Sequence, residues 1–156
     1  MTRSPPLMHV PPSVLFAVVF GAGLGLQHLV PLDSEAPGVA TTSRAIGVAL
    51  LVCGVLLGLY CVTMFAFART TVIPHGTASK LMTQGPYRFT RNPMYVAMTL
   101  VYLGAAGVLV EVWPLVLLPI AVAFVNGIVI PYEEARLHDR FGDAYDAYRA
   151  SVGRWV

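Results

Sequence analysis

Four long apolar stretches constrain the fold of this chain more than any other feature of its sequence. They run from Val14 to Val30, from about Ala45 to Ala68, from about Met94 to Val110 and from about Val112 to Ile130. Each is near the roughly 20 residues that an α-helix needs to cross a hydrocarbon core about 30 Å thick. We therefore predict an all-α integral membrane protein of about four transmembrane helices, forming a single domain over residues 1–156.

The composition supports a membrane protein over a soluble or nucleic-acid-binding one. Of the 156 residues, 56% are hydrophobic and 12% are charged, which is about half the charged share of a soluble domain. The net charge of +2 is too small to indicate nucleic acid as a partner. We interpret the first apolar stretch as a retained helix, because only Arg3 precedes it and no small-x-small cleavage motif precedes Asp33 to Glu35.

The basic residues indicate which ends of the helices face the cytoplasm. With four spans, nine of the ten basic residues share one side of the membrane: Arg3, Arg69, Lys80, Arg88, Arg91, Arg136, Arg140, Arg149 and Arg154. The other side holds only Arg44. Basic residues are enriched in cytoplasmic loops, so we predict a multi-pass inner-membrane protein with both termini in the cytoplasm.

Short connections and small residues predict how the helices pack. Only Glu111 and the Trp113-Pro114 corner separate the third and fourth stretches, which predicts a tight antiparallel hairpin. Small residues let membrane helices approach closely, and we assign that role to the glycines of the first three stretches. They are Gly21, Gly23, Gly25, Gly47, Gly54, Gly58, Gly104 and Gly107.

After Pro131 the sequence becomes amphipathic, with apolar residues every three or four positions among charged ones. This pattern predicts a C-terminal helical segment. Gly142 followed by Asp143 is typical of a helix end and a new N-cap, so the segment should break into two short helices.

Two polar clusters carry the candidate chemistry. One is Gly85-Pro86-Tyr87-Arg88-Phe89-Thr90-Arg91-Asn92-Pro93-Met94-Tyr95, before the third helix, and the other is Pro131-Tyr132-Glu133-Glu134, after the fourth. Because the hairpin returns the chain to the same face of the membrane, we expect the two clusters to be neighbours in space.

These clusters, followed by the F-G-x-x-Y-x-x-Y pattern of residues 141–148, resemble the isoprenylcysteine carboxyl methyltransferase and phospholipid methyltransferase superfamily. The approach at residues 70–74 and 81–85 is similar to its bacterial members, so the resemblance covers about residues 69–155. It implies a methyltransferase that uses S-adenosylmethionine and releases S-adenosylhomocysteine. The implied cofactor shell is Gly85, Tyr87, Arg91, Asn92, Tyr95, Glu133 and Glu134.

The chemistry of these side chains suits that cofactor. Arg91 and the open N–H groups at the start of the third helix suit a carboxylate. Glu133 or Glu134 suits ribose hydroxyls or the ammonium group, and tyrosine rings suit adenine or the sulfonium. The same glutamates are the candidate catalytic pair, because methyl transfer to a protonated amine requires removal of a proton.

Simpler roles compete with each assignment. Asn92-Pro93 is also a typical helix start, and Arg91 could extend only to lipid phosphates. Glu133 and Glu134 could be solvated charges beside a membrane span. Tyr145 and Tyr148 are better explained by packing than by cofactor contact. The four histidines have no metal-ligand spacing, so we predict no metal.

The chain departs from the resemblance at the acceptor side. The isoprenylcysteine enzymes have an arginine four residues before the first glutamate, where this chain has Val129. Asn92 replaces a histidine that many members have, which removes any proton transfer at that position. Asn126 is the strongly polar residue of the fourth stretch and a candidate substrate contact, although a helix–helix hydrogen bond would also explain it.

We therefore predict methyl transfer to a hydrophobic or amphiphilic acceptor, with the lipid bilayer as partner. Lipid amine, isoprenoid-like carboxylate and thiol acceptors stay open. A nicotinamide-dependent membrane reductase and a non-enzymatic membrane scaffold are the alternatives.

Overall fold

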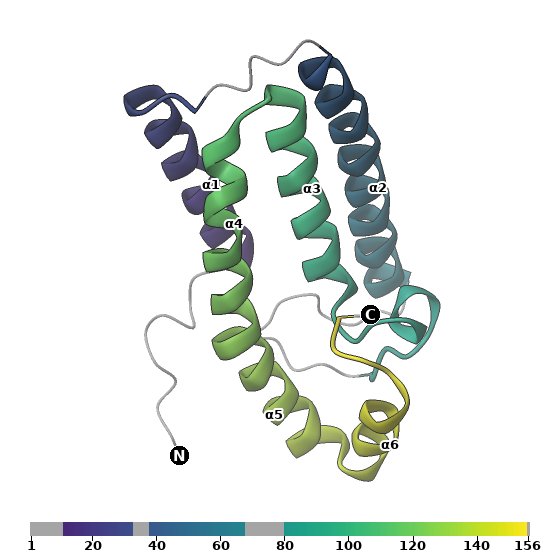
Figure 1. Cartoon of the computed structure of the whole chain (residues 1–156). Helices are drawn as coiled ribbons and strands as arrows, with labels where there is room; N and C mark the ends of the chain where they lie inside the picture. The colour runs from purple at the N-terminus through teal and green to yellow at the C-terminus, as the bar shows by residue number, and fades with distance from the viewer. Residues whose placement is uncertain (1–10, 33–37, 68–79, 156) are drawn as a thin grey trace.

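The computed structural model describes residues 11–32, 38–67 and 80–155, and within these ranges the chain contains helices and no strand. The four long helices are α1 (Pro12–Leu29), α2 (Val39–Phe67), α3 (Pro93–Leu109) and α4 (Val112–Phe124). They alternate in direction, so the end of α2, the start of α3 and the end of α4 meet at one end of the molecule (Figure 1). Some of the predictions concern residues outside the described ranges. These are Arg3, the histidines His9 and His75, Asp33 to Glu35, Arg69 and residues 70–74.

The helices have the length and the apolar surface of a multi-pass membrane protein. Three are long and apolar enough to cross a bilayer, namely Pro12–Leu29, Val39–Phe67 and the continuous helix Val112–Phe141, and α3 is an apolar helix of 17 residues. Large apolar side chains stand exposed on them, including Val18 at 62%, Leu56 at 60% and Ile120 at 58%. In water such surfaces would be costly, whereas in lipid they are matched to their surroundings. The predicted fold class is confirmed.

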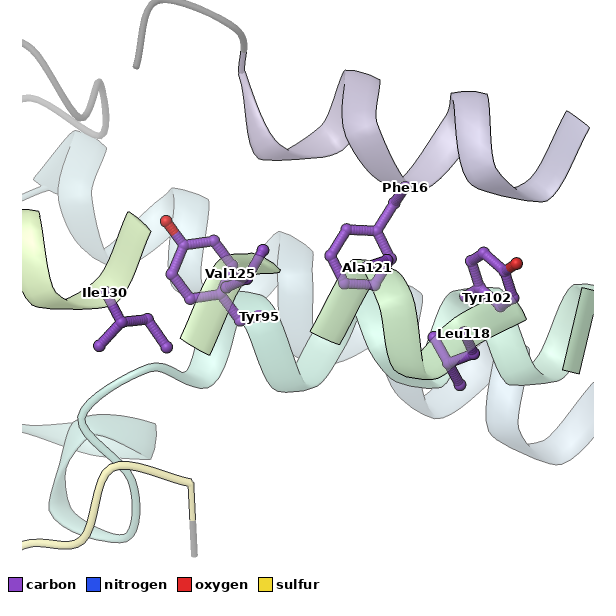
Figure 2. Packing of buried hydrophobic residues seen from close by; sticks show 7 residues of the cluster. All are labelled: Phe16, Tyr95, Tyr102, Leu118, Ala121, Val125 and Ile130. Carbon is purple, nitrogen blue, oxygen red and sulfur yellow. The ribbon is translucent and has the colours of Figure 1, made fainter. Parts of the chain in front are cut away.

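The helices pack mainly in two pairs, α2 against α3 and α1 against α4. Helices α3 and α4 follow each other through Val110 and Glu111, as predicted, but their mutual contact is smaller than either pair's. A buried cluster joins the pairs: Phe16, Tyr95, Tyr102, Leu118, Ala121, Val125 and Ile130 (Figure 2). Within it, Tyr102 donates to the carbonyl of Pro114 at 2.9 Å.

Glycine explains why α2 and α3 lie so close. A Cβ at Gly47 would meet the backbone of Gly104, Gly107 and Val108 at 2.5–2.8 Å, and one at Gly54 would meet Val101 N at 2.8 Å. Gly104 is pressed against the backbone of Leu51 in the same way. The packing role predicted for these glycines is confirmed.

The three glycines of α1 differ in whether they contact another helix. A Cβ at Gly23 would lie 2.7 Å from the Cα of Pro114, so this residue does serve close packing with α4. Among the described residues, no atom from outside their own stretch of helix lies within 4 Å of the Cβ position of Gly21 or Gly25, so the packing role assigned to them is wrong within this part of the chain. Gly58 on α2 makes only an ordinary contact, at 3.7 Å from Ala97 Cβ.

The fourth span does not end at Ile130. It continues through the π-helical segment η3 (Val125–Val129) into α5 (Ile130–Phe141), which projects beyond the end of the bundle (Figure 1). Pro131 lacks an N–H and its ring would normally clash with the carbonyl four residues earlier. The wider π turn, in which Ile130 N–H bonds to Val125 O, lets the helix continue through that proline.

The amphipathic segment breaks where predicted. Gly142 ends α5 at φ +49°, and α6 (Asp143–Ser151) turns back beneath the bundle. The N-cap of α6 is Gly142 and Asp143 is its first helical residue, so the N-cap position predicted for Asp143 is wrong by one residue. Residues 152–155, which we call the C-terminal strap, then run back towards the start of α3.

Candidate active site

The structure brings the two polar clusters together at one end of the helix bundle. The first cluster comprises the 3-10 turn η2 (Gly85–Arg88) and the start of α3, and the second is the first turn of α5. The C-terminal strap lies between them, and each cluster is hydrogen-bonded to it. The site therefore has three walls, and the strap is the one that the sequence motifs did not indicate.

Asn92 fastens the strap to the start of α3. It occupies the N-cap position, but its side chain does not cap the helix. Its Nδ2 instead donates to the carbonyl of Arg154 at 2.9 Å, and the Thr90 hydroxyl donates to the same oxygen at 3.1 Å. Arg91 N–H donates to Gly153 O at 2.9 Å. The interpretation of Asn92 as a helix cap alone is wrong, because its amide makes a tertiary contact.

Glu134 lies between two arginines. Its Oε1 is 3.1 Å from Arg91 Nη1, and Arg154 binds both oxygens, with Nη2 to Oε2 at 2.7 Å and Nε to Oε1 at 3.1 Å. The glutamate is 9% exposed. A carboxylate this buried requires paired cations. The alternative of a solvated surface charge is therefore wrong for Glu134. Its interaction also raises the pKa of the Arg154 guanidinium.

Arg91 is more deeply buried than Arg154. Besides Glu134, its Nη1 donates to the Tyr145 hydroxyl at 3.3 Å. Its side chain is 11% exposed, so the alternative in which it extends to lipid phosphates is wrong. Among the described residues, Arg91 Nε is buried without a hydrogen-bond partner. Buried polar groups are nearly always paired, and an orphan donor calls for an explanation.

Glu133 faces a different neighbour from Glu134. Tyr95, itself 6% exposed, donates its hydroxyl to Glu133 Oε1 at 2.7 Å, which joins α3 directly to α5. A phenol hydrogen bond to a carboxylate at this distance is charge-assisted and strong. A carboxylate can accept several more hydrogen bonds, so acceptor capacity remains at Glu133. The two adjacent glutamates therefore differ: Glu134 is bound by two arginines, whereas Glu133 accepts a hydrogen bond from the Tyr95 hydroxyl.

Gly85 and Tyr87, in the η2 turn of the first cluster, connect the site to α2 and α6. Gly85 has φ +58°, and a Cβ there would lie 2.7 Å from Met64 Sδ at the end of α2. Tyr87 packs edge-on against Phe65 of α2, and its carbonyl accepts from the Tyr148 hydroxyl at 2.7 Å. Burial above all, and the nearby charge of Glu133 to a smaller extent, raise the pKa of Tyr87, so its hydroxyl stays protonated.

The remaining tyrosines and Asn126 support the strap and α6. Tyr145 is 1% exposed, which confirms its packing role, and burial raises the pKa of Tyr148 to about 12 and keeps that donor protonated. Asn126 lies in the π-helical segment. Its Oδ1 accepts from Trp155 Nε1 at 3.0 Å and from Arg154 Nη1 at 3.4 Å. This bond joins a helix to the strap, so the helix–helix alternative for Asn126 is wrong.

Sequence reasoning missed the strap and its partners. From the sequence, Arg154 stands out only as a positive charge, Trp155 only as one of the apolar residues after Pro131, and Thr90 only as a member of the first cluster. The available signal was the Arg154-Trp155 pair itself, because a charged residue beside a large aromatic at the end of an amphipathic segment suggests an anchored tail.

Comparison with known families gives a match over more than half of the chain. The profile of the phospholipid methyltransferase family matches residues 42–144, which is 103 of the 156 residues. The chain belongs to the phospholipid methyltransferase family. The family match begins within α2, earlier than the predicted resemblance, and includes both polar clusters but stops before the strap. No curated protein and no solved structure matches the chain.

Proposed function

We propose that this protein transfers a methyl group from S-adenosylmethionine to an amphiphilic acceptor at the cytoplasmic face of the inner membrane. The observation that carries the proposal is the buried Arg91 in a member of a methyltransferase family. It pairs with Glu134 just before α3, and its Nε has no hydrogen-bond partner among the residues that the structure describes. An orphan guanidinium donor beside carboxylates suits a ligand with both an anionic and a cationic end.

The residues present fit the proposed cofactor. Arg91 Nε and the uncapped N-terminus of α3 suit the carboxylate of its amino-acid portion. Glu133 has acceptor capacity for ribose hydroxyls or the ammonium group, and the rings of Tyr87 and Tyr95 suit adenine or the sulfonium. When bound, S-adenosylmethionine supplies a methyl group that is already activated by its positive sulfur.

The protein's own part in the reaction is alignment, exclusion of water and removal of a proton. Holding two reactants in line can lower the activation free energy by several kcal/mol. Glu133 is the carboxylate placed to accept a proton from an amine acceptor, and the Tyr95 hydroxyl fixes its orientation. Glu134 cannot easily leave its two arginines, so we assign it a holding role.

The acceptor is proposed to be a lipid that enters from the bilayer beside the π-helical segment. The family description favours a phospholipid amine. Val129 in that segment, where the isoprenylcysteine enzymes have an arginine, removes the ion partner that a prenylated carboxylate would need. The distribution of basic residues supports placing the site and both termini in the cytoplasm.

Ligand-induced stabilisation of the detergent-solubilised protein tests the proposal. S-adenosylhomocysteine should raise the melting temperature, since a ligand at 100 times its Kd stabilises by about 2.7 kcal/mol. A nicotinamide-dependent reductase would respond to NADPH instead, and a scaffold would respond to neither. Stabilisation by NADPH alone would refute the methyltransferase assignment.

Two variants place the binding site. Arg91→Ala and Glu133→Ala should both insert and purify, because Glu134 keeps Arg154 as its partner in each. Both should lose most of their affinity for S-adenosylhomocysteine. Arg140→Ala, which removes an exposed cation from α5, serves as the control. Wild-type affinity in both site variants would show that the assigned binding site is wrong. Incubating membranes with methyl-labelled cofactor and extracting the labelled lipid would then identify the acceptor.

A further inference from the structure

The strap is anchored by its backbone independently of the Arg154 side chain. Gly153 O accepts from Arg91 N–H at 2.9 Å, and Arg154 O accepts from Thr90 and Asn92 at 3.1 and 2.9 Å. Trp155 adds an indole hydrogen bond to Asn126. Three of these bonds use main-chain oxygens, so shortening the Arg154 side chain would leave them in place.

The Arg154 side chain is therefore not needed to anchor the strap. Its Nη1 bonds to Asn126 Oδ1 at 3.4 Å, and its other contacts are with Glu134. It binds both carboxylate oxygens in the fork geometry that a guanidinium favours. Arg91 reaches the same carboxylate only through Nη1. One negative charge thus faces two positive ones, and the group of three carries a net charge of +1.

This sharing leaves Arg91 only partly neutralised. Within the part of the chain that the structure describes, its Nε is buried without a hydrogen-bond partner, and its side chain is 11% exposed. If Arg154 were absent, Glu134 could turn to Arg91 alone, and the two would form the usual bidentate pair with no net charge. A ligand carboxylate would then gain little binding free energy from Arg91.

We propose that Arg154 is a positioning residue that holds Glu134 so that Arg91 can bind the carboxylate of the cofactor's amino-acid portion. The inference rests on the proposed function and adds a residue outside both sequence clusters. Arg154 need not touch the cofactor, because its effect passes through Glu134 to Arg91.

The test compares two ligands on Arg154→Gln. S-adenosylhomocysteine has the amino-acid carboxylate, whereas 5′-methylthioadenosine keeps the nucleoside and thioether and lacks it. We expect affinity for the first to fall about 10- to 100-fold, the range for losing a charge-assisted hydrogen bond. Affinity for the second should stay within about twofold of wild type, because a carboxylate is absent. Arg154→Lys should rescue partially, and Arg140→Gln should bind both ligands as wild type does.

A double-mutant cycle with Glu134→Gln tests the route of the effect. Once the carboxylate is gone, nothing competes for Arg91, so adding Arg154→Gln should no longer weaken S-adenosylhomocysteine binding. The double-mutant cycle tests the positioning role of Arg154 even if 5′-methylthioadenosine binds too weakly to measure.

The failures of the two proposals are distinguishable. If the wild-type protein does not bind S-adenosylhomocysteine, the proposed function is wrong and the inference with it. If the wild type binds but Arg154→Gln binds equally well, or loses both ligands alike, only the positioning role is overturned. Loss of S-adenosylhomocysteine binding in Glu134→Gln alone would also overturn it, since Glu134 would then be a direct ligand contact.

Discussion

Replacing Gly54 with alanine should separate α2 from α3 and lower the stability of the folded protein. The added Cβ would lie 2.8 Å from Val101 N and 2.9 Å from Ala97 O, both backbone atoms that cannot rotate away. Ordinary van der Waals contact begins at 3.4 Å, so the helices must move apart by about 0.6 Å at this crossing. Overpacking of this kind costs about 1–3 kcal/mol.

Gly58→Ala is the matched control for this prediction. It lies one turn along the same helix, where the new Cβ would sit 3.7 Å from Ala97 Cβ, an ordinary contact. Both variants gain the same helix propensity, about 0.5–1 kcal/mol, so their difference isolates the packing cost. Unfolding of both in mixed micelles with increasing denaturing detergent measures that difference. Equal stability of the two variants would refute the argument that backbone contact at Gly54 sets the α2–α3 distance.

The remaining predictions concern the turn and the tyrosines that shape the site. Gly85→Ala should destabilise by about 1–2 kcal/mol from its left-handed backbone alone, plus a packing cost at Met64. Gly38→Ala is also at positive φ, and none of the described residues lies within 4 Å of its Cβ position, so it should show only the backbone cost. Equal thermal shifts of the two variants would exclude a role for the α2 contact. Tyr148→Phe removes the donor to Tyr87 O and should cost about 1–3 kcal/mol in the unfolding free energy, whereas Tyr132→Phe, partly exposed, should stay within about 0.5 kcal/mol of wild type. A neutral Tyr148→Phe variant would show that water satisfies the Tyr87 carbonyl.

Hydrophobic length and patterning were sufficient to predict the architecture. A chain whose apolar runs match the bilayer thickness has few alternatives to helices, because every backbone group must be satisfied within its own segment. The family was likewise recognisable from two short clusters around Asn92 and Glu133, and the family match over residues 42–144 bears this out. The break at Gly142 was predictable because glycine tolerates the positive φ observed there.

Other features depended on contacts that no local pattern contains. Which glycines pack was decided by the pairing of α2 with α3 and of α1 with α4, so Gly54 is buried while Gly21 faces open space. The continuation of the fourth span through Pro131 was decided by the π turn before it. Periodicity alone predicts neither, because both depend on how neighbouring segments meet.

What the sequence determined by itself was the set of helices, their alternation across the membrane and the gathering of two polar clusters at one end. These follow from hydrophobic length and chain connectivity, which act along the chain. The tertiary structure alone decided how the charges are shared, with Glu134 between Arg91 and Arg154 and Glu133 bound to Tyr95. Adjacent glutamates of identical chemistry acquire different roles because helix geometry points successive side chains about 100° apart, towards different neighbours.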